Sequence, residues 1–393
     1  MRSSSVVHLA GVAAWLAVAV STAAAQTTYP TVKVSGRLHT QFYYFGNEDY
    51  AALGGNTATQ NNFFVRRARI EARVQLNEYI TAFIQPDFAG GRSTSTSTSC
   101  RPVVVNNPLP DTVSVSCSSS STDGVRLRDA WIDVRFSKPD AKTAFTVRLG
   151  QEKKPFSRYE LTSSTNLPSI ERGAGRGLIG SASNDLFAAS GYLAHDVGAS
   201  ARVERKLEGG RMASLTAGIY NGRGESANDN NNSKSYGVRA SADIWSKLSI
   251  GGSYFSHDGI VGADTAYRNN GYGVDAQWNK PGEPGLFALA EYLGGETAAD
   301  NSINMTGIQA VAAYNIRMKS PTSFLYAIEP ALRFDRADPD TDADDNESTL
   351  ISAVLGFYLT SKAQWRIAYE TQNFAASGAE SISGVRTALT VSF

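Results

Sequence analysis

Hydrophobic and polar residues alternate along most of the chain with a period of two. Between residues 32 and 45 the apolar side chains share one face of an extended segment, and the polar ones share the other, because successive side chains of a strand point to opposite faces. The apolar face carries Val32, Val34, Leu38, Phe42 and Tyr44, and the polar face carries Lys33, Ser35, Arg37, His39 and Gln41. The pattern predicts a strand longer than the strands of typical globular proteins.

The same alternation returns in residues 64–76, 130–136, 324–335 and 365–372. In the first of these, Phe64, Ala68 and Ile70 lie on the apolar side, and charged residues lie on the other. We expect about sixteen strands. Their expected starts are residues 32, 63, 79, 125, 143, 185, 211, 235, 248, 267, 285, 304, 323, 348, 363 and 384.

The expected connections alternate between short turns and longer polar loops, an asymmetry typical of outer-membrane barrels. A soluble β-sandwich has shorter strands, and a propeller would show an internal repeat that this sequence lacks. The last strand, 384–393, is amphipathic and ends in Phe393, which resembles the signal read by the barrel assembly machinery. The predicted fold is all-β, a transmembrane antiparallel β-barrel. The longer loops are expected near 46–62, 90–124, 157–184, 222–234, 297–303 and 336–347.

The N-terminus predicts export. Arg2 precedes an almost wholly apolar run from Val6 to Val20, and small residues of the A-x-A type follow it, as at the cleavage site of a secretory signal. A membrane-anchoring helix is the alternative, but the run is shorter than the ~20 residues that a spanning helix needs. We therefore expect a signal peptide at 1–25, a single barrel domain at 26–393, and location in a bacterial outer membrane.

Composition and charge narrow the class of protein further. The chain holds 35 glycines and 34 tyrosines and phenylalanines, which suit turns and strands. It has 37 basic and 37 acidic side chains, and removing Arg2 leaves a formal net charge of −1. Without a basic excess, nucleic acid is not an expected partner. Any preference for anions must therefore depend on where the charges lie.

An arginine ladder is the main candidate for chemistry. Arg67, Arg69 and Arg73 share the polar face of one strand, and Arg37 lies on the preceding strand. Guanidinium groups bind phosphate and carboxylate bidentately, so a lumen lined with them would concentrate anions. The alternative is that these arginines pair with neighbouring carboxylates and are structural. Arg66 conflicts with the pattern, because its parity points it at lipid unless it lies at the rim or a bulge re-aims it.

Four segments, in order, resemble the phosphate-selective porin O and P family. The resemblance covers most of the chain after the signal. The segments are Phe64-Val65-Arg66-Arg67-Ala68-Arg69-Ile70-Glu71, Leu127-Arg128-Asp129-Ala130-Trp131-Ile132, Gly150-Gln151-Glu152-Lys153-Lys154-Pro155-Phe156-Ser157 with Glu160-Leu161-Thr162-Ser163-Ser164 and Glu171-Arg172, and Thr216-Ala217-Gly218-Ile219-Tyr220-Asn221-Gly222.

The resemblance implies a trimeric, sixteen-stranded barrel whose third outer loop folds inward and whose lumen is lined with basic residues. Carried over by motif, Arg66, Arg67 and Asp129 would lie near the constriction, with Lys153 and Lys154 at its approach. Phosphate-specific members have a lysine two residues before the Thr-Ser-Ser element, where this chain has a carboxylate that opposes a phosphate site. The expected constriction-loop residues are Glu160, Glu171, Arg172 and Arg176; an ordinary exposed loop is the alternative.

Three other features of the sequence carry predictions. Cys100 and Cys117 lie in a Ser/Thr-rich loop, where an oxidising compartment favours a disulfide over two free thiols. The acidic stretch 335–347 lacks the spacing of a calcium loop, so we expect a solvated loop and no metal site. No hydrolase or metalloprotease motif is present, and no cofactor is expected.

The sequence thus predicts an outer-membrane porin for passive diffusion of small hydrophilic solutes, with a preference for anions such as phosphate. The expected partners are these solutes, outer-membrane lipid and two further copies of the chain in a homotrimer. A general or cation-preferring porin remains an alternative. So does a barrel that does not conduct, acting as an enzyme or in adhesion.

Overall fold

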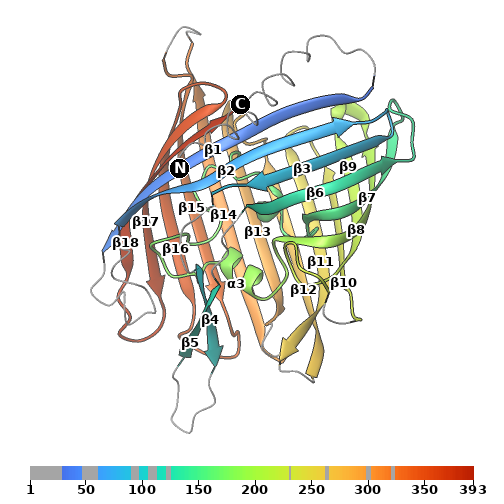
Figure 1. Ribbon diagram of the computed structural model, residues 1–393. Coiled ribbons are helices and arrows are strands. Elements are labelled where there is room, and N and C mark those ends of the chain that lie inside the picture. The colour runs from blue at the N-terminus through green and yellow to red at the C-terminus, as the bar shows by residue number, and fades with distance from the viewer. Residues whose placement is uncertain are drawn as a thin grey trace, which may run out of the picture.

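Sixteen strands close into one antiparallel barrel (Figure 1). The structure is a computed structural model, and it describes residues 29–46, 61–89, 97–104, 113–120, 125–229, 232–261, 265–297, 302–319 and 324–393. Around the ring, each strand pairs with its neighbours in the barrel, and β1 closes the ring by pairing with both β2 and β18. The prediction of an all-β, sixteen-stranded antiparallel barrel is confirmed.

The barrel strands are long, and most of them begin within four residues of the predicted starts. Their bounds are β1 Thr31–Gly46, β2 Asn61–Gln75, β3 Ile80–Asp87, β6 Arg126–Arg135, β7 Thr143–Lys153, β8 His195–Lys206, β9 Met212–Tyr220, β10 Ser235–Asp243, β11 Leu248–Val261, β12 Thr265–Trp278, β13 Gly285–Glu296, β14 Asn304–Arg317, β15 Ala327–Asp338, β16 Ser348–Tyr358, β17 Ala363–Phe374 and β18 Ile382–Ser392. A 3-10 turn, η3 (Glu208–Gly210), joins β8 to β9.

The two faces of the strands have opposite chemistry. On β1, Val34 and Leu38 are 61% and 46% exposed, whereas His39 and Gln41 are each 3% exposed. The apolar side chains therefore point outward, and the polar ones point into the barrel. An apolar outer surface around a polar interior is the arrangement that a lipid bilayer stabilises. In the part of the chain that the structure describes, no helix is long and apolar enough to cross a membrane.

The C-terminal residue takes part in closing the barrel. The amide of Gly36 donates to the Phe393 carbonyl at 2.9 Å, and the amide of Phe393 donates to the Gly36 carbonyl at 3.1 Å. The ring of Phe393 is 62% exposed, like the other outward-facing residues of β18. The last residue thus continues the pairing between β18 and β1.

One predicted strand, expected to start near residue 185, is wrong. Residues Ser183–Ala189 form the helix α3, and β8 begins ten residues later than that start, at His195. The amide and hydroxyl of Ser183 both donate to a carboxylate oxygen of Asp335 at 2.8 Å, which fixes the start of the helix. Gly191, with a φ of 88°, reverses the chain after the helix.

The Ser/Thr-rich connection between β3 and β6 contains a hairpin that the alternation did not predict. Strands β4 (Ser97–Val104) and β5 (Val113–Ser120) pair with each other in a separate two-stranded sheet. Cys100 lies opposite Cys117 in this register, a backbone position compatible with a disulfide. The bond itself stays a prediction, as does the signal peptide at 1–25, which lies outside the described residues.

Candidate functional site

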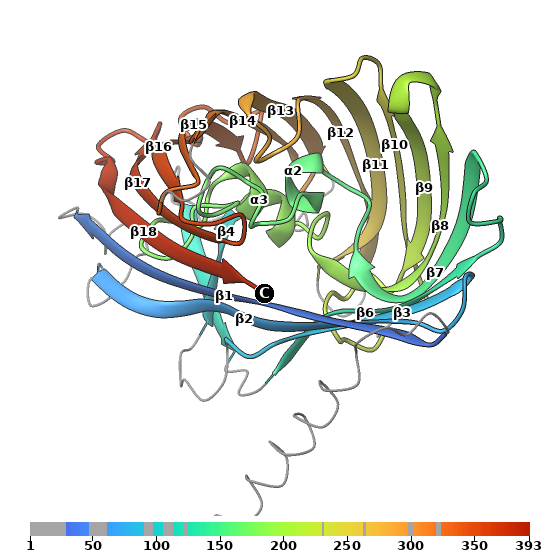
Figure 2. The same cartoon turned by 90° about the horizontal axis from the view of Figure 1, so that it is seen from above.

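The connection from β7 to β8, residues 154–194, contains the helices α2 (Arg158–Leu161) and α3. Viewed from above, both helices are seen inside the ring of strands (Figure 2). The connection contacts polar side chains from opposite parts of the barrel. Arg37 of β1 donates to the Ser164 hydroxyl at 3.2 Å, and Arg158 donates to the Ser249 hydroxyl of β11 at 3.0 Å.

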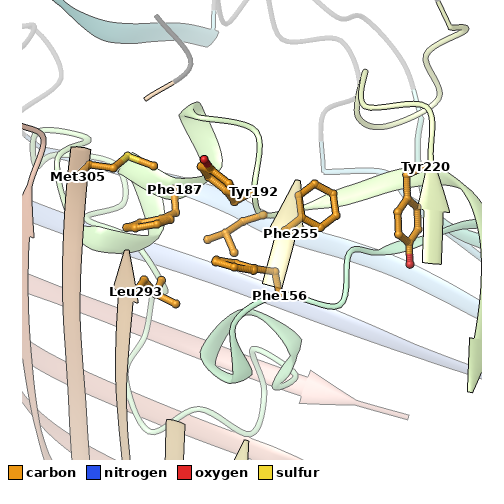
Figure 3. Close-up of a cluster of buried hydrophobic side chains, with 8 residues drawn as sticks. Phe156, Phe187, Tyr192, Tyr220, Phe255, Leu293 and Met305 are labelled. Atoms are coloured by element: carbon orange, nitrogen blue, oxygen red, sulfur yellow. The ribbon is translucent and has the colours of Figure 1, made fainter. Parts of the chain in front are cut away.

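An aromatic cluster fixes both ends of this connection to the barrel wall (Figure 3). Phe156, Phe187 and Tyr192 come from the connection, and each is fully buried. The Tyr192 hydroxyl donates to the carbonyls of Asn270 and Glu296, both at 2.9 Å. Such a cluster holds the connection against the wall because moving it would expose several large rings. The wall contributes Tyr220, Phe255, Leu293 and Met305 from β9, β11, β13 and β14.

Carboxylates of the wall hold the N-termini of both helices. Glu291 of β13 accepts from the Ser157 hydroxyl at 2.6 Å and from the amides of Arg158 and Tyr159 at 2.5 and 3.3 Å. Asp335 of β15 accepts from the amide of Ser183. The first amides of a helix lack partners within the helix, so a carboxylate placed there satisfies them. These acidic groups are therefore used for anchoring.

Arginines of the wall hold backbone carbonyls of the same connection. Arg333 of β15 donates to the carbonyls of Glu171 and Gly173, both at 3.0 Å. Arg386 of β18 donates to the Ala174 carbonyl at 3.0 Å, and Arg366 of β17 donates to the Thr165 carbonyl at 3.1 Å. Two of the three also bind carboxylates at 2.7 Å: Arg333 with Asp335, and Arg386 with Glu370.

A β-bulge in β2 re-aims Arg66. In the register between β1 and β2, His39 pairs with Arg67 and Thr40 pairs with Val65, so Arg66 is the extra residue. Its guanidinium donates two hydrogen bonds to Glu171, at 2.7 and 3.1 Å. The conflict in its parity is thus explained by a bulge. The predicted outward position of Phe64 is wrong for the same reason: its ring lies 6.0 Å from that of Tyr43, which is buried inside the barrel.

Glu171 is held by two arginines. Besides Arg66, Arg67 lies 3.6 Å from its carboxylate, and Gln41 donates to it at 2.6 Å. Burial alone would raise the pKa of Glu171, but the charges of Arg66 and Arg67 outweigh burial and keep the pKa well below its usual range. Arg67 also lies 2.8 Å from the ring of His39. The acidic side chain is therefore ionised and compensated.

A second bulge places another arginine in the lumen. In the register between β3 and β6, Gln85 pairs with Asp129 and Pro86 pairs with Leu127, which leaves Arg128 as the extra residue. Arg128 forms an ion pair with Glu225 of the β9–β10 connection. Sequence reasoning did not select Arg128, although its motif and Pro86, which cannot donate to a ladder, were visible signals.

Asp129 belongs to the same charged group. His195 lies between two carboxylates, 3.2 Å from Asp129 through Nε2 and 3.2 Å from Glu225 through Nδ1. Asp129 thus has a basic partner, and its expected place near the constriction stays a prediction. In the described residues no cluster of three or more His, Cys, Asp or Glu side chains could hold a metal ion.

Glu160, which lies in the first turn of α2, is compensated by two cations. Lys153 lies 3.0 Å and Arg172 lies 3.4 Å from its carboxylate oxygens, and Asn184 donates to it at 3.3 Å. Burial raises the pKa of Glu160, but these charges and hydrogen bonds together outweigh burial and lower the pKa to about 2. Where phosphate-specific members of the family have a lysine, this chain thus has an ionised carboxylate in a salt-bridge network.

The arginine ladder is partly neutralised. Arg37 pairs with Glu71 at 3.2 Å, and Arg69 pairs with Asp87 at 2.7 Å. Arg73 differs: within the described chain it has no carboxylate partner and lies against aromatic rings. The ladder therefore combines paired arginines, which the alternative expected, with an exposed and unpaired one.

Two other predicted residues have different surroundings. Lys154, expected at the approach to the constriction, is 4% exposed and lies 5.4 Å from the Phe255 ring centroid, so it belongs to the aromatic cluster. Burial lowers its pKa to about 8. Arg176 is exposed and lies 4.6 Å over the Phe64 ring. Lys154 is thus buried, whereas Arg176 is accessible to solvent.

Charge is distributed unevenly around the barrel. Strands β1, β2, β3, β6 and β7 carry eleven Lys and Arg against five Asp and Glu, a net charge of +6. Strands β12 to β16 carry four against six, a net charge of −2. All five carboxylates of the first group have a basic side chain as partner in the structure; they are Glu71, Asp87, Asp129, Asp133 and Glu152. We call strands β1, β2, β3, β6 and β7 the basic wall.

A closed sixteen-stranded antiparallel barrel with an apolar outer surface and a charged interior defines the porin class of β-barrel. A family model described as phosphate-selective porin O and P matches residues 32–385. The chain belongs to this family. Family and fold together identify a channel protein of the bacterial outer membrane, and they point away from an enzyme.

Solved structures of outer-membrane proteins share the fold at low sequence identity. The anion-selective porin from Comamonas acidovorans is 13% identical with a TM-score of 0.56, and the match covers 93% of this chain and 100% of that one. The channel DcaP of Acinetobacter baumannii is 11% identical with a TM-score of 0.53, over 94% and 99%. The trimer form of OmpT from Vibrio cholerae is 10% identical with a TM-score of 0.54, over 93% and 100%. No curated protein sequence matches this chain significantly.

Proposed function

We propose that this porin passes small hydrophilic solutes by passive diffusion and prefers anions. The observation that carries the proposal is the basic wall, with its net charge of +6 in a chain whose total charge is zero. Charged side chains that line a narrow pore select ions of opposite sign, because they act where the ion must pass. Distant acidic groups are screened beyond a Debye length of about 8–10 Å.

We further propose that residues 154–194 form the constriction, as the third outer loop folded into the pore. Short turns of barrels face the periplasm and long connections face outward. The long connections begin after β1, β3 and β7, so this one is the third. Its contacts with Arg37 on one side and Ser249 on the other support a position across the lumen. Solutes would pass beside this loop, along the part of the basic wall that the loop does not contact.

The loop's own acidic residues do not favour a cation-preferring pore. Glu171 is held by Arg66 and Arg67, and Glu160 is held by Lys153 and Arg172. Glu291 and Asp335, on the far wall, bind helix N-termini. Carboxylates that are paired with cations contribute little negative potential in the pore. Arg73 and Arg176 have no acidic partner in the described chain and contribute a positive potential. The balance at the passage is therefore positive.

Phosphate is proposed to pass without a tight site. Phosphate-specific members carry a lysine at the position of Glu160. Here Glu160 forms salt bridges with Lys153 and Arg172, two cations that a bound phosphate would need. Transport also requires binding weak enough for release. We expect phosphate to reduce single-channel chloride current only at millimolar concentrations. Block at micromolar concentrations would contradict this and support a phosphate-specific pore.

We also propose a homotrimer that is exported by the signal at 1–25 and assembled through its C-terminal Phe393. The trimer form of the OmpT structure supports the oligomer by fold likeness. The exposed Phe393 at the seam between β18 and β1 is available to the assembly machinery. Mass measurement of the native complex and of its N-terminus tests both statements, with three chains and an N-terminal Gln26 as the expected result.

A further inference from the structure

A row of four inward-facing side chains crosses the basic wall close to the short turns. Lys33 of β1 pairs with Arg73 of β2, Arg73 pairs with Phe83 of β3, and Phe83 pairs with Trp131 of β6. Partners in register lie beside one another on the same face of a sheet. We call these four residues the aromatic–cation row.

The aromatic rings of the row position the guanidinium of Arg73. The ring centroids of Phe83 and Trp131 are 5.0 Å apart with an interplanar angle of 25°. The Cζ atom of Arg73 lies 5.0 Å from the Phe83 centroid and 5.2 Å from the Trp131 centroid. Arg148 lies over Trp131 at 3.6 Å. Cation–π contacts of this kind hold an arginine in place while its N–H edges stay free.

The two cations of the row are unpaired, although acidic residues lie on both neighbouring rows. Within the described chain, neither Lys33 nor Arg73 forms an ion pair, and both side chains are exposed. Each nearby carboxylate already has a partner: Glu71 binds Arg37 at 3.2 Å, Asp129 binds His195 at 3.2 Å, and Asp133 binds Arg148 at 2.6 Å. The row therefore presents two positive charges beside an aromatic surface.

We propose that the aromatic–cation row is a binding subsite for planar aromatic carboxylates of the benzoate class. The ligand carboxylate accepts hydrogen bonds from the Arg73 guanidinium and the Lys33 ammonium, and the ligand ring packs against Phe83, which is half-buried. An inorganic anion would use the cations alone and gain nothing from the rings. This proposal rests on the proposed anion passage and names one class of anion that would bind in it. The aromatic anion would bind at the periplasmic end of the lumen.

The test compares two carboxylates of equal charge and similar size on the intact protein in a planar bilayer. Benzoate and cyclohexanecarboxylate are each titrated against the chloride current, from the side of the short turns. Aromatic pairs add about 0.5–1.5 kcal/mol beyond burial, so benzoate should reach half-block at a concentration about two- to tenfold lower. Equal half-block concentrations for the two compounds in the wild-type pore would overturn the proposal.

Variants separate the rings from the charge. Phe83→Leu keeps an apolar side chain and should bring benzoate to the level of cyclohexanecarboxylate, whereas Arg73→Gln should weaken both compounds. Arg202→Gln is the matched control. This substitution removes a positive charge from the inner face of β8, where Arg202 alternates with the outward Val203. Arg202 contacts no aromatic ring in the described chain, so the benzoate preference should persist.

An undiminished benzoate preference in Phe83→Leu would also overturn the subsite, because the rings would then only position Arg73. If this variant fails to assemble, the wild-type comparison still decides the question. The reversal potential in potassium chloride reports separately on anion preference. A pore that prefers cations, yet binds benzoate more tightly than cyclohexanecarboxylate, would refute the proposed passage and leave the subsite standing.

Discussion

Single residues determine which charges of this barrel reach its lumen. Arg66 and Arg128 would both face lipid in regular strands, and each becomes an inward residue because its strand has one residue more than its neighbour at that point. A charge at the centre of a bilayer costs about 2–4 kcal/mol. The alternation of residues showed that Arg66 would face lipid in a regular strand. It could not predict the bulge, because a bulge depends on the register between two strands and alternation describes only one.

Glu171 is predicted to hold the loop and to reduce anion preference. Glu171→Gln removes the charge that Arg66 and Arg67 share, so the pore should become more selective for chloride. The variant should also be less stable by about 1–3 kcal/mol, because two cations lose their partner. Reversal potential and thermal unfolding measure the two effects. Glu347→Gln, which breaks the exposed pair with Arg336, is the control and should change neither.

The pKa of Glu160 predicts an acid-sensitive loop. Because the pKa is lowered from 4.5 to about 2 in the folded state, the charged carboxylate contributes stability above pH 4.5, and this contribution is lost as the pH falls toward 2. Glu160→Gln should therefore unfold at a lower temperature than wild type near neutral pH, and the difference should shrink in acid. Thermal unfolding at several pH values checks this; a difference independent of pH would refute it.

Strands and helices could be predicted from the sequence where the residues of the element itself determine its structure. The long strands followed from period-two alternation because lipid and lumen impose opposite chemistry on the two faces. The helix α3 was missed because its start depends on Asp335, far away in the sequence, which binds the amide of Ser183. Similarly, the role of Glu291 as a partner for the first amides of α2 arises only when β13 lies beside the loop.

Anchoring of α2 by Glu291 predicts a loop that moves when the anchor is removed. Glu291→Ala should leave the amides of Arg158 and Tyr159 without their acceptor, so the channel should show larger and noisier single-channel currents. Glu329→Ala is a matched control on the same wall, since Glu329 binds Asn315 and Tyr358 and no residue of the loop. Currents in Glu291→Ala that match those of the control would refute the anchoring role.

The β4–β5 hairpin predicts a disulfide that acts locally. Cys100 and Cys117 are opposite partners in the register, and the bond would join β4 to β5, which form a sheet separate from that of the barrel. A double Ser variant should change the proteolysis of this connection and leave the unfolding temperature of the barrel the same. Mass spectrometry of the untreated protein should find the two residues linked. Two free thiols in protein isolated from the outer membrane would count against the bond.

At the scale of the whole molecule, the charges are unevenly distributed around the barrel although their total is zero. The sequence predicted that anion preference, if present, depends on the placement of charge, because the sums of basic and acidic residues are equal. It placed Arg67, Arg69 and Arg73 on the inner face of β2 and named pairing with neighbouring carboxylates as the alternative, but it did not identify Glu171 and Asp87 as the partners of Arg67 and Arg69. Those pairings depend on neighbouring strands and on the loop. What remains is the excess of cations on the basic wall, to which Lys33 and Arg73 contribute.

The central claim is that this wall makes the pore prefer anions. The most direct test is the reversal potential of the wild-type channel in a planar bilayer under a potassium chloride gradient, with no other ions present. The basic wall predicts a reversal potential displaced toward the equilibrium potential of chloride. A displacement toward the equilibrium potential of potassium, or none, would show that the carboxylates of the loop and far wall control permeation, and would contradict the proposed anion preference.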